Sequence, residues 1–178
     1  MKTTLFRSLS LAAILTVASA ALISSTVTAQ SAAEAYVAKS EQTRKIADEF
    51  FQLYLHAKVD QLRPFYAENA TWHDPTAGEL WGMTMKSGVD TIIEHHKQVL
   101  KGLVTNELTI ERSFFSGSYA HYTAIMDFTW YSPDKSTSKH FKLPISVVLK
   151  IENGKITEHR DYGDYVTWLE YSKKDSQG

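Results

Sequence analysis

Acidic residues stand at three places where folding could bring them into one pocket. Asp74 precedes a proline at the end of an apolar segment, Asp127 lies within a long apolar run, and Asp161 follows His159 by two positions. Residues two apart on a strand share a face, so His159 and Asp161 point the same way and Arg160 points the other way. Apolar walls and a neighbouring acid both raise the pKa of a carboxyl group towards neutral pH, as a general acid or base requires. These residues predict proton abstraction next to a carbonyl group, or activation of a water molecule.

Each of these residues also has an interpretation that involves no chemistry. An aspartate before a proline is typical of a turn that the side chain caps, which would account for Asp74. Asp161 would be a buried partner of Arg160 or of the first helix, Asp127 a solvated strand residue, and His159 a hydrogen-bonded residue of the pocket wall. The sequence alone leaves both interpretations open.

Helical periodicity dominates the part of the chain that precedes Gly102. Apolar residues recur at helical spacing from Ser40 to Ala57, and a shorter helix is expected over residues 60–66. A strand over residues 71–75 follows, and a third helix is expected from Val89 to Leu100. These elements would place Asp74 at the end of a strand that lies between helices.

After Gly102 the apolar period changes from about 3.6 to 2, which indicates strands. Strands are expected at residues 104–111, 119–131, 141–151 and 156–162, and Asn153-Gly154 is a strong two-residue hairpin signal. Helices followed by an antiparallel meander predict an α+β fold. We expect a curved, mostly antiparallel sheet wrapped around the N-terminal helices to form a cone with one pocket.

The N-terminus has the pattern of a secretory signal peptide. Lys2 and Arg7 precede an apolar run from Leu9 to Ile23, and Val27-Thr28-Ala29 supplies the small residues of a cleavage site, with Ala20 as the second choice. The mature protein is expected to be periplasmic or secreted and not membrane-bound. The expected organisation is a signal peptide at 1–29, a flexible segment at 30–39, one domain at 40–172 and a tail at 173–178.

The composition excludes several classes of function. The chain has no cysteine, which rules out disulfide bonds, thiolate catalysis and sulfur-ligated metals. Its formal net charge is -1 and it has no basic run, so nucleic acid is not an expected partner. No two histidines have the i, i+4 spacing of a zinc site, and there is no glycine-rich phosphate loop. We expect no metal and no cofactor, and a small hydrophobic molecule as partner; a homodimer stays open.

Two segments, FYAENATWHDP and ENGKITEHRDYGDY, stand in an order of helices and long strands that resembles the SnoaL-like branch of the nuclear transport factor 2-like superfamily. Polyketide cyclases, ketosteroid isomerases and limonene epoxide hydrolases are related to this branch. The resemblance covers about Ser40 to Leu169. It implies a pocket for a small hydrophobic ligand and a cofactor-free isomerase, cyclase or hydrolase with a carboxylate base. The alternative is a ligand-binding or protein-interaction module without turnover.

The sequence matches the catalytic residues of each related enzyme family only in part. Asp74 falls where the steroid isomerases place their general base, but Phe50 and Ser146 stand where their oxyanion-binding tyrosine and acid would be. His159-Arg160-Asp161 looks like the segment with the water-activating acid of the epoxide hydrolases, but no arginine stands two residues before Asp127. The SnoaL-like cyclases use an acid in such a pocket as a base on an activated carbon acid, which is a looser requirement that this sequence could meet.

The expected site comprises candidate catalytic residues and candidate ligand-binding residues. The catalytic candidates are Asp74, Asp127, His159 and Asp161. The ligand-binding candidates are Phe50, Tyr54, Trp72, His73, His121 and Ser146. Asp161 or Asp74 is expected to act as the base, with His159 as its orienting partner.

Overall fold

The computed structural model describes the backbone of residues 12–174 and the side chains of residues 30–170. The chain divides into two units, one that ends at Ala38 and one that begins at Lys39. Helix α1 (Ala12–Leu55) begins in the first unit and provides all of its described residues. The sheet and the candidate site belong to the second unit.

The N-terminal predictions are tested only in part. Residues 1–11 lie outside the described residues, and only the helical backbone of residues 12–29 is described, so the signal peptide stays a prediction. Residues 30–39 belong to α1, so the prediction that the first helix starts at Ser40 is wrong. This stretch is rich in alanine, the strongest helix former, and Gln30 donates to Glu34 one turn later at 3.3 Å. Within the described part of the chain, no helix has the length and apolar character needed to span a membrane.

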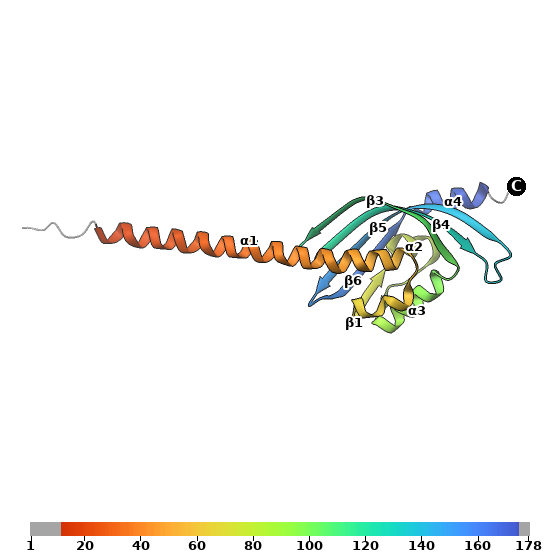
Figure 1. Cartoon of the computed structure of the whole chain (residues 1–178), viewed down its shortest axis with the longest axis horizontal. Coiled ribbons are helices and arrows are strands. Elements are labelled where there is room, and N and C mark those ends of the chain that lie inside the picture. Colours follow the sequence, from red (N-terminus) through yellow and green to blue (C-terminus); the bar gives the residue numbers. More distant parts are fainter. Residues whose placement is uncertain (1–11, 175–178) are drawn as a thin grey trace, which may run out of the picture. The chain divides into compact units, whose positions relative to one another are not determined.

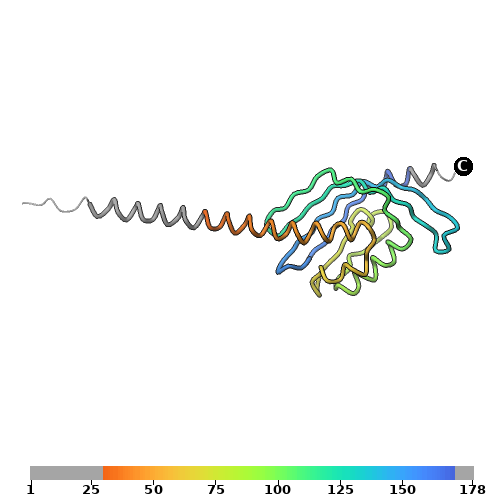
Figure 2. Tube along the Cα trace, in the orientation of Figure 1, coloured from red at the N-terminus to blue at the C-terminus, as the bar shows by residue number. Residues whose placement is uncertain are grey.

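Six strands form one curved sheet in the order β2-β1-β6-β5-β4-β3, which does not close on itself. The strands are β1 (Tyr66–His73), β2 (Lys86–Ser87), β3 (Leu103–Ser116), β4 (Tyr119–Tyr131), β5 (Ser138–Glu152) and β6 (Lys155–Gly163). Neighbouring strands are antiparallel except β1 and β6, which are parallel. Figure 1 shows the long strands arching over α3, and the trace in Figure 2 follows the same curve. The predicted α+β class is confirmed.

The helical elements after α1 differ from the prediction at several points. They are η1 (Val59–Gln61), η2 (Arg63–Phe65), α2 (Pro75–Trp81), α3 (Val89–Val99) and α4 (Tyr165–Lys174). The predicted second helix is replaced by the two 3₁₀ turns η1 and η2, because Pro64 has no N–H to continue a helix. The sequence did not predict α2 and α4. Helix α4 reaches into the predicted tail, of which residues 175–178 lie outside the described residues.

The concave face of the sheet packs on α1 and forms the core. Along β4, buried residues alternate with more exposed ones, so every second residue points inward. The inward residues are Ala120, Tyr122, Ala124, Met126 and Phe128. Phe51 of α1 stacks on Tyr122 with ring centroids 4.0 Å apart. This alternation decides which β4 residues can reach a pocket inside the cone.

Candidate functional site

A pocket of about 380 Å³ lies inside the cone, between the concave face of the sheet and residues of α1, α2, α3 and α4. Most of its wall is apolar: Leu55, Trp72, Trp81, Met83, Val99, Leu100, Leu103, Met126, Phe128, Trp130, Leu143, Ile145 and Trp168. All four tryptophans of the chain are in this wall. Its polar residues are Tyr54, Asp74, His95, Gln98, Asp161 and Tyr165, and no described lysine or arginine lines it. A larger hollow beside Arg63, Glu68 and Lys155 is lined by exposed charged side chains and encloses less apolar surface.

Asp161 of β6 lies in the pocket wall and is surrounded by hydrogen-bond donors. Tyr54 Oη donates to Asp161 Oδ2 at 2.6 Å, and Trp72 Nε1 donates to the same oxygen at 2.8 Å. His159 Nε2 lies 2.8 Å from Asp161 Oδ1. Burial alone would raise the pKa of Asp161, but the charge of His159 and the three donors outweigh burial and lower that pKa. The expectation that an apolar wall raises the pKa of this acid is therefore wrong.

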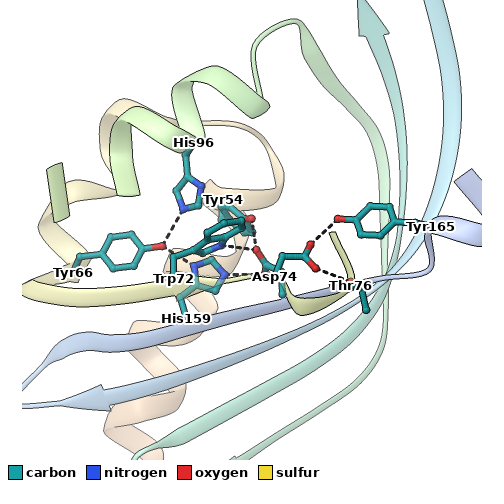
Figure 3. Close-up of polar contacts among 9 residues, drawn as sticks. Tyr54, Tyr66, Trp72, Asp74, Thr76, His96, His159 and Tyr165 are labelled. Atoms are coloured by element: carbon teal, nitrogen blue, oxygen red, sulfur yellow. Dashed lines mark hydrogen bonds and ion pairs between the residues drawn. The ribbon is translucent and has the colours of Figure 1, made fainter. Parts of the chain in front are cut away.

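The hydrogen bonds continue from Asp161 through His159 to Tyr66 and His96, and Figure 3 shows Tyr66 between the two histidines. Tyr66 Oη lies 2.6 Å from His159 Nδ1 and 3.2 Å from His96 Nε2. A carboxylate only accepts, so His159 donates from Nε2, and in its neutral form it accepts at Nδ1 from the Tyr66 hydroxyl. The Tyr66 oxygen then accepts from His96 Nε2.

His96 ends this chain of hydrogen bonds inside the protein. Burial, and to a lesser extent the neighbouring His159, lower the pKa of His96 to about 3, and Asp161 opposes this shift only weakly. His96 is therefore neutral at physiological pH. Its Nδ1 is buried and has no hydrogen-bond partner among the described residues. With Nε2 donating to Tyr66, that unpartnered nitrogen is a bare acceptor and not a stranded N–H.

Asp74 caps helix α2 and lines the pocket with the same carboxylate. Its Oδ1 accepts from the Ala77 backbone N–H at 2.8 Å and from Thr76 Oγ1 at 2.6 Å, which is the geometry of an N-cap. Its Oδ2 accepts from Tyr165 Oη at 2.6 Å, as Figure 3 shows. Asp74 is only 4% exposed. The capping interpretation of Asp74 is confirmed, and the pocket interpretation is compatible with it.

The parallel pairing of β1 with β6 brings the two acids to the same end of the sheet. His73 lies opposite Arg160, so the next residues along the chain, Asp74 and Asp161, are neighbours. His159 and Asp161 are buried, whereas Arg160 is exposed. The predicted common face of His159 and Asp161 is confirmed.

His95 on α3 is a pocket residue that the sequence did not identify. Its Nε2 is buried without a hydrogen-bond partner among the described residues. Its ring lies against Trp72, with ring centroids 4.4 Å apart. Burial lowers the pKa of His95, and Lys86 lowers it further, which favours the neutral imidazole. No sequence pattern points to His95, because a helical histidine lines a pocket only where neighbouring elements leave space beside it.

Three predicted site residues lie on the outer face of the sheet. Asp127 Oδ1 lies 2.6 Å from Nε2 of His140, and His121 Nε2 lies 2.8 Å from Ser146 Oγ. None of these side chains lines the pocket. The prediction that Asp127, His121 and Ser146 belong to the pocket is therefore wrong. The reason is strand alternation, since the apolar residues on both sides of Asp127 take the inner face.

The four remaining ligand-binding candidates divide evenly. Tyr54 and Trp72 line the pocket, whereas Phe50 and His73 do not. Phe50 is fully buried one helical turn before Tyr54, and its ring lies edge-on to His159 with centroids 5.4 Å apart. His73 points away because it alternates with Trp72 and the capping acid that follows. Among the described residues, no group of three acidic or histidine side chains is arranged to hold a metal ion.

The sequence model of the SnoaL-like domain matches residues 47–159. No curated protein sequence matches this chain. A solved structure assigned as a SnoaL-like polyketide cyclase from Shewanella putrefaciens CN-32 is similar with a TM-score of 0.65 at 20% identity, over 75% of this chain and 97% of that one.

Two further solved structures share this fold. An LEH-like epoxide hydrolase of M. tuberculosis is similar with a TM-score of 0.57 at 13% identity, over 74% of this chain and 89% of that one. A protein with a ketosteroid isomerase-like fold from Catenulispora acidiphila DSM 44928, solved in complex with trimethylamine, has a TM-score of 0.56 at 18% identity, over 72% of this chain and 92% of that one. At such identities these likenesses show the fold alone.

Proposed function

The chain belongs to the SnoaL-like domain family, and we propose that this member binds a small hydrophobic molecule in its pocket and transforms it without a cofactor, with Asp161 as the general base. One observation carries the proposal: a buried carboxylate, surrounded by three donors, lies in the wall of an apolar pocket. A carboxylate has about four acceptor positions, so one position remains for the proton of a ligand.

The reaction that suits this arrangement is removal of a proton from a carbon atom next to a carbonyl group. The C–H bond breaks, the proton passes to Asp161, and the electron pair moves onto the carbonyl oxygen to form an enolate. His95 is the group available for that oxygen, because its neutral ring places an unpartnered Nε2 in the wall. As an N–H donor it would stabilise the developing negative charge. The enolate then takes the proton back from Asp161 at another carbon, or its carbon attacks a second carbonyl group of the ligand to close a ring and the new alkoxide takes the proton from Asp161.

The lowered pKa of Asp161 restricts the substrate. A weaker base removes a proton only from a more acidic carbon, and each pKa unit between them adds about 1.4 kcal/mol to the transfer. We therefore expect a C–H group between two carbonyls, as in an apolar β-dicarbonyl compound. His159 holds the Asp161 carboxylate in place, and Tyr66 orients the His159 ring so that its Nε2 faces that carboxylate.

The second candidate function is binding without turnover. The same donors that hold Asp161 make it a poor base, which favours this alternative. A protein of the same fold was solved in complex with trimethylamine, which supports the binding of a small ligand by this fold. The two candidates differ in whether the ligand is recovered unchanged.

Thermal unfolding with a panel of apolar β-dicarbonyls, lactones, epoxides and sterols separates the candidates. A ligand at about 100 times its Kd adds roughly 2.7 kcal/mol, which shifts Tm by several degrees. For an enzyme, wild type and Asp127→Asn convert the ligand, whereas Asp161→Asn binds it and returns it intact. Asp127→Asn is the matched control because this acid lies on the outer face of the same sheet. Recovery of unchanged ligand from all three proteins would identify a binding module, and no shift with any class would refute the pocket as a site for these uncharged ligands.

A further inference from the structure

Asp74 is a buried acid without a cationic partner in the described part of the chain. Its three donors, the Ala77 backbone N–H and the hydroxyls of Thr76 and Tyr165, are all neutral. None of the ion pairs between described residues includes Asp74. Asp161, in contrast, has His159 at 2.8 Å, which supplies a positive charge when its ring is protonated. Buried acids are normally paired with a cation, and the N-terminus of α2 gives Asp74 only a partial positive charge.

Three aromatic rings pack against one another next to this acid and form what we call the aromatic corner: Trp81, Tyr165 and Trp168, of which Tyr165 contacts Asp74. The ring centroids of Trp81 lie 4.7 Å from Tyr165 and 4.8 Å from Trp168, and those of Tyr165 and Trp168 are 5.5 Å apart. Each pair is tilted and not stacked flat, so the corner presents ring faces in different directions. All three rings line the pocket, and Tyr165 also holds Asp74. Aromatic faces attract organic cations, most strongly when the cation is removed from water.

The electrostatics of the wall agree with this arrangement. Two carboxylates, Asp74 and Asp161, line the pocket, whereas no described lysine or arginine does. The lining imidazole, His95, favours its neutral form. An anionic ligand would meet only repulsion from these acids, and a neutral one would leave Asp74 without a counter-charge.

We propose that the ligand is an organic cation, an alkyl- or arylalkylammonium compound whose nitrogen lies between Asp74 and the aromatic corner while its apolar part occupies the rest of the pocket. This assignment rests on the proposed ligand binding in this pocket and adds a positive charge to the ligand, which a β-dicarbonyl substrate would carry on a part remote from its reacting carbon. The apolar part meets Met126, Phe128 and Leu143 on the concave face of the sheet. The lining does not fit a metal ion as the occupant, because such ions require several oxygen ligands and no group of three described acidic or histidine side chains is arranged to supply them.

The test compares two probes of nearly the same shape, trimethyl(2-phenylethyl)ammonium and 3,3-dimethylbutylbenzene, in which carbon replaces the charged nitrogen. Binding is followed by intrinsic tryptophan fluorescence, which reports on this pocket because all four tryptophans line it. Wild type should bind the ammonium probe about tenfold more tightly than the carbon probe. Asp74→Asn should remove that preference and leave the affinity for the carbon probe unchanged. Asparagine is also a good N-cap, so this variant keeps the start of α2. Asp127→Asn is the matched control and should keep the preference.

A second variant tests the aromatic corner independently of the acid. Trp81 is 47% exposed, so Trp81→Leu disturbs the core little, and it should lower the preference for the ammonium probe several-fold. Calorimetry measures this variant, because it has lost one of the four fluorophores.

Equal or tighter binding of the carbon probe, or a preference that survives Asp74→Asn, would overturn the cation assignment while the apolar pocket stands. If neither probe binds, the cation assignment is also overturned. The β-dicarbonyl, lactone, epoxide and sterol panel then decides separately whether the proposed ligand pocket stands.

Discussion

The buried His96 should make the fold sensitive to mild acid. Its pKa is lowered to about 3 in the folded protein, mainly by burial, from the ordinary value of 6.5. Between these values the unfolded chain binds more protons at this residue than the folded chain does. Stability from the neutral imidazole is therefore complete above about pH 6.5 and is lost as the pH falls towards 3.

The size of the effect follows from the two pKa values. At pH 5 an unfolded histidine with a pKa of 6.5 is about 1.5 units below its titration point, while the folded His96 is still neutral. The free energy of unfolding should then be about 2 kcal/mol lower at pH 5 than at pH 8 from this residue alone. The loss should keep growing as the pH falls, because the folded pKa has not yet been reached.

Urea unfolding of wild type and His96→Gln at pH 8 and pH 5 measures this contribution. Glutamine does not titrate and can still bond to Tyr66, so the wild type should lose about 2 kcal/mol more than the variant between the two pH values. His56→Gln, which removes an exposed histidine, should behave like wild type. If His96→Gln shows the same pH dependence as wild type, His96 does not keep its neutral form by burial and the reasoning is refuted.

Three further predictions concern other parts of the chain. Asp161→Asn should lower the free energy of unfolding by about 1–3 kcal/mol. The side-chain amide of the asparagine would donate to His159 Nε2, which reverses the tautomer of neutral His159 and leaves a buried N–H of His96 without an acceptor at the end of the hydrogen-bond chain. An unchanged His159 tautomer by ¹⁵N NMR would contradict this. Gly102→Ala should cost about 2 kcal/mol or more in a urea melt, because φ is +83° and a Cβ would overlap the Tyr131 carbonyl oxygen; an unchanged midpoint would argue against that backbone conformation. Mass spectrometry of the exported protein should find Gln30 at the N-terminus, and a chain that keeps Met1 would contradict the signal peptide.

Local patterns in the sequence determined the four long strands β3, β4, β5 and β6 and the family. Strand β4 runs from Tyr119 to Tyr131 as its period of two predicts, and the resemblance to SnoaL-like domains is confirmed by the family match. The common face of His159 and Asp161 also follows from local stereochemistry. The same alternation, applied to Asp127 between two apolar neighbours, would have placed that acid on the outer face. These features depend only on residues close together in the chain, so one sequence is sufficient to read them.

The properties of the site were decided by tertiary contacts between distant residues. The donors that lower the pKa of Asp161 include Tyr54 and Trp72, which stand 107 and 89 residues before it. Asp74 has its second contact with Tyr165, 91 residues later, on a helix that the sequence did not predict. A carboxylate in an apolar wall is a strong or a weak base according to the donors around it. Local sequence fixes which residues face the cavity, and only the curvature of the sheet and the docking of α1 and α4 fix which donors reach each acid.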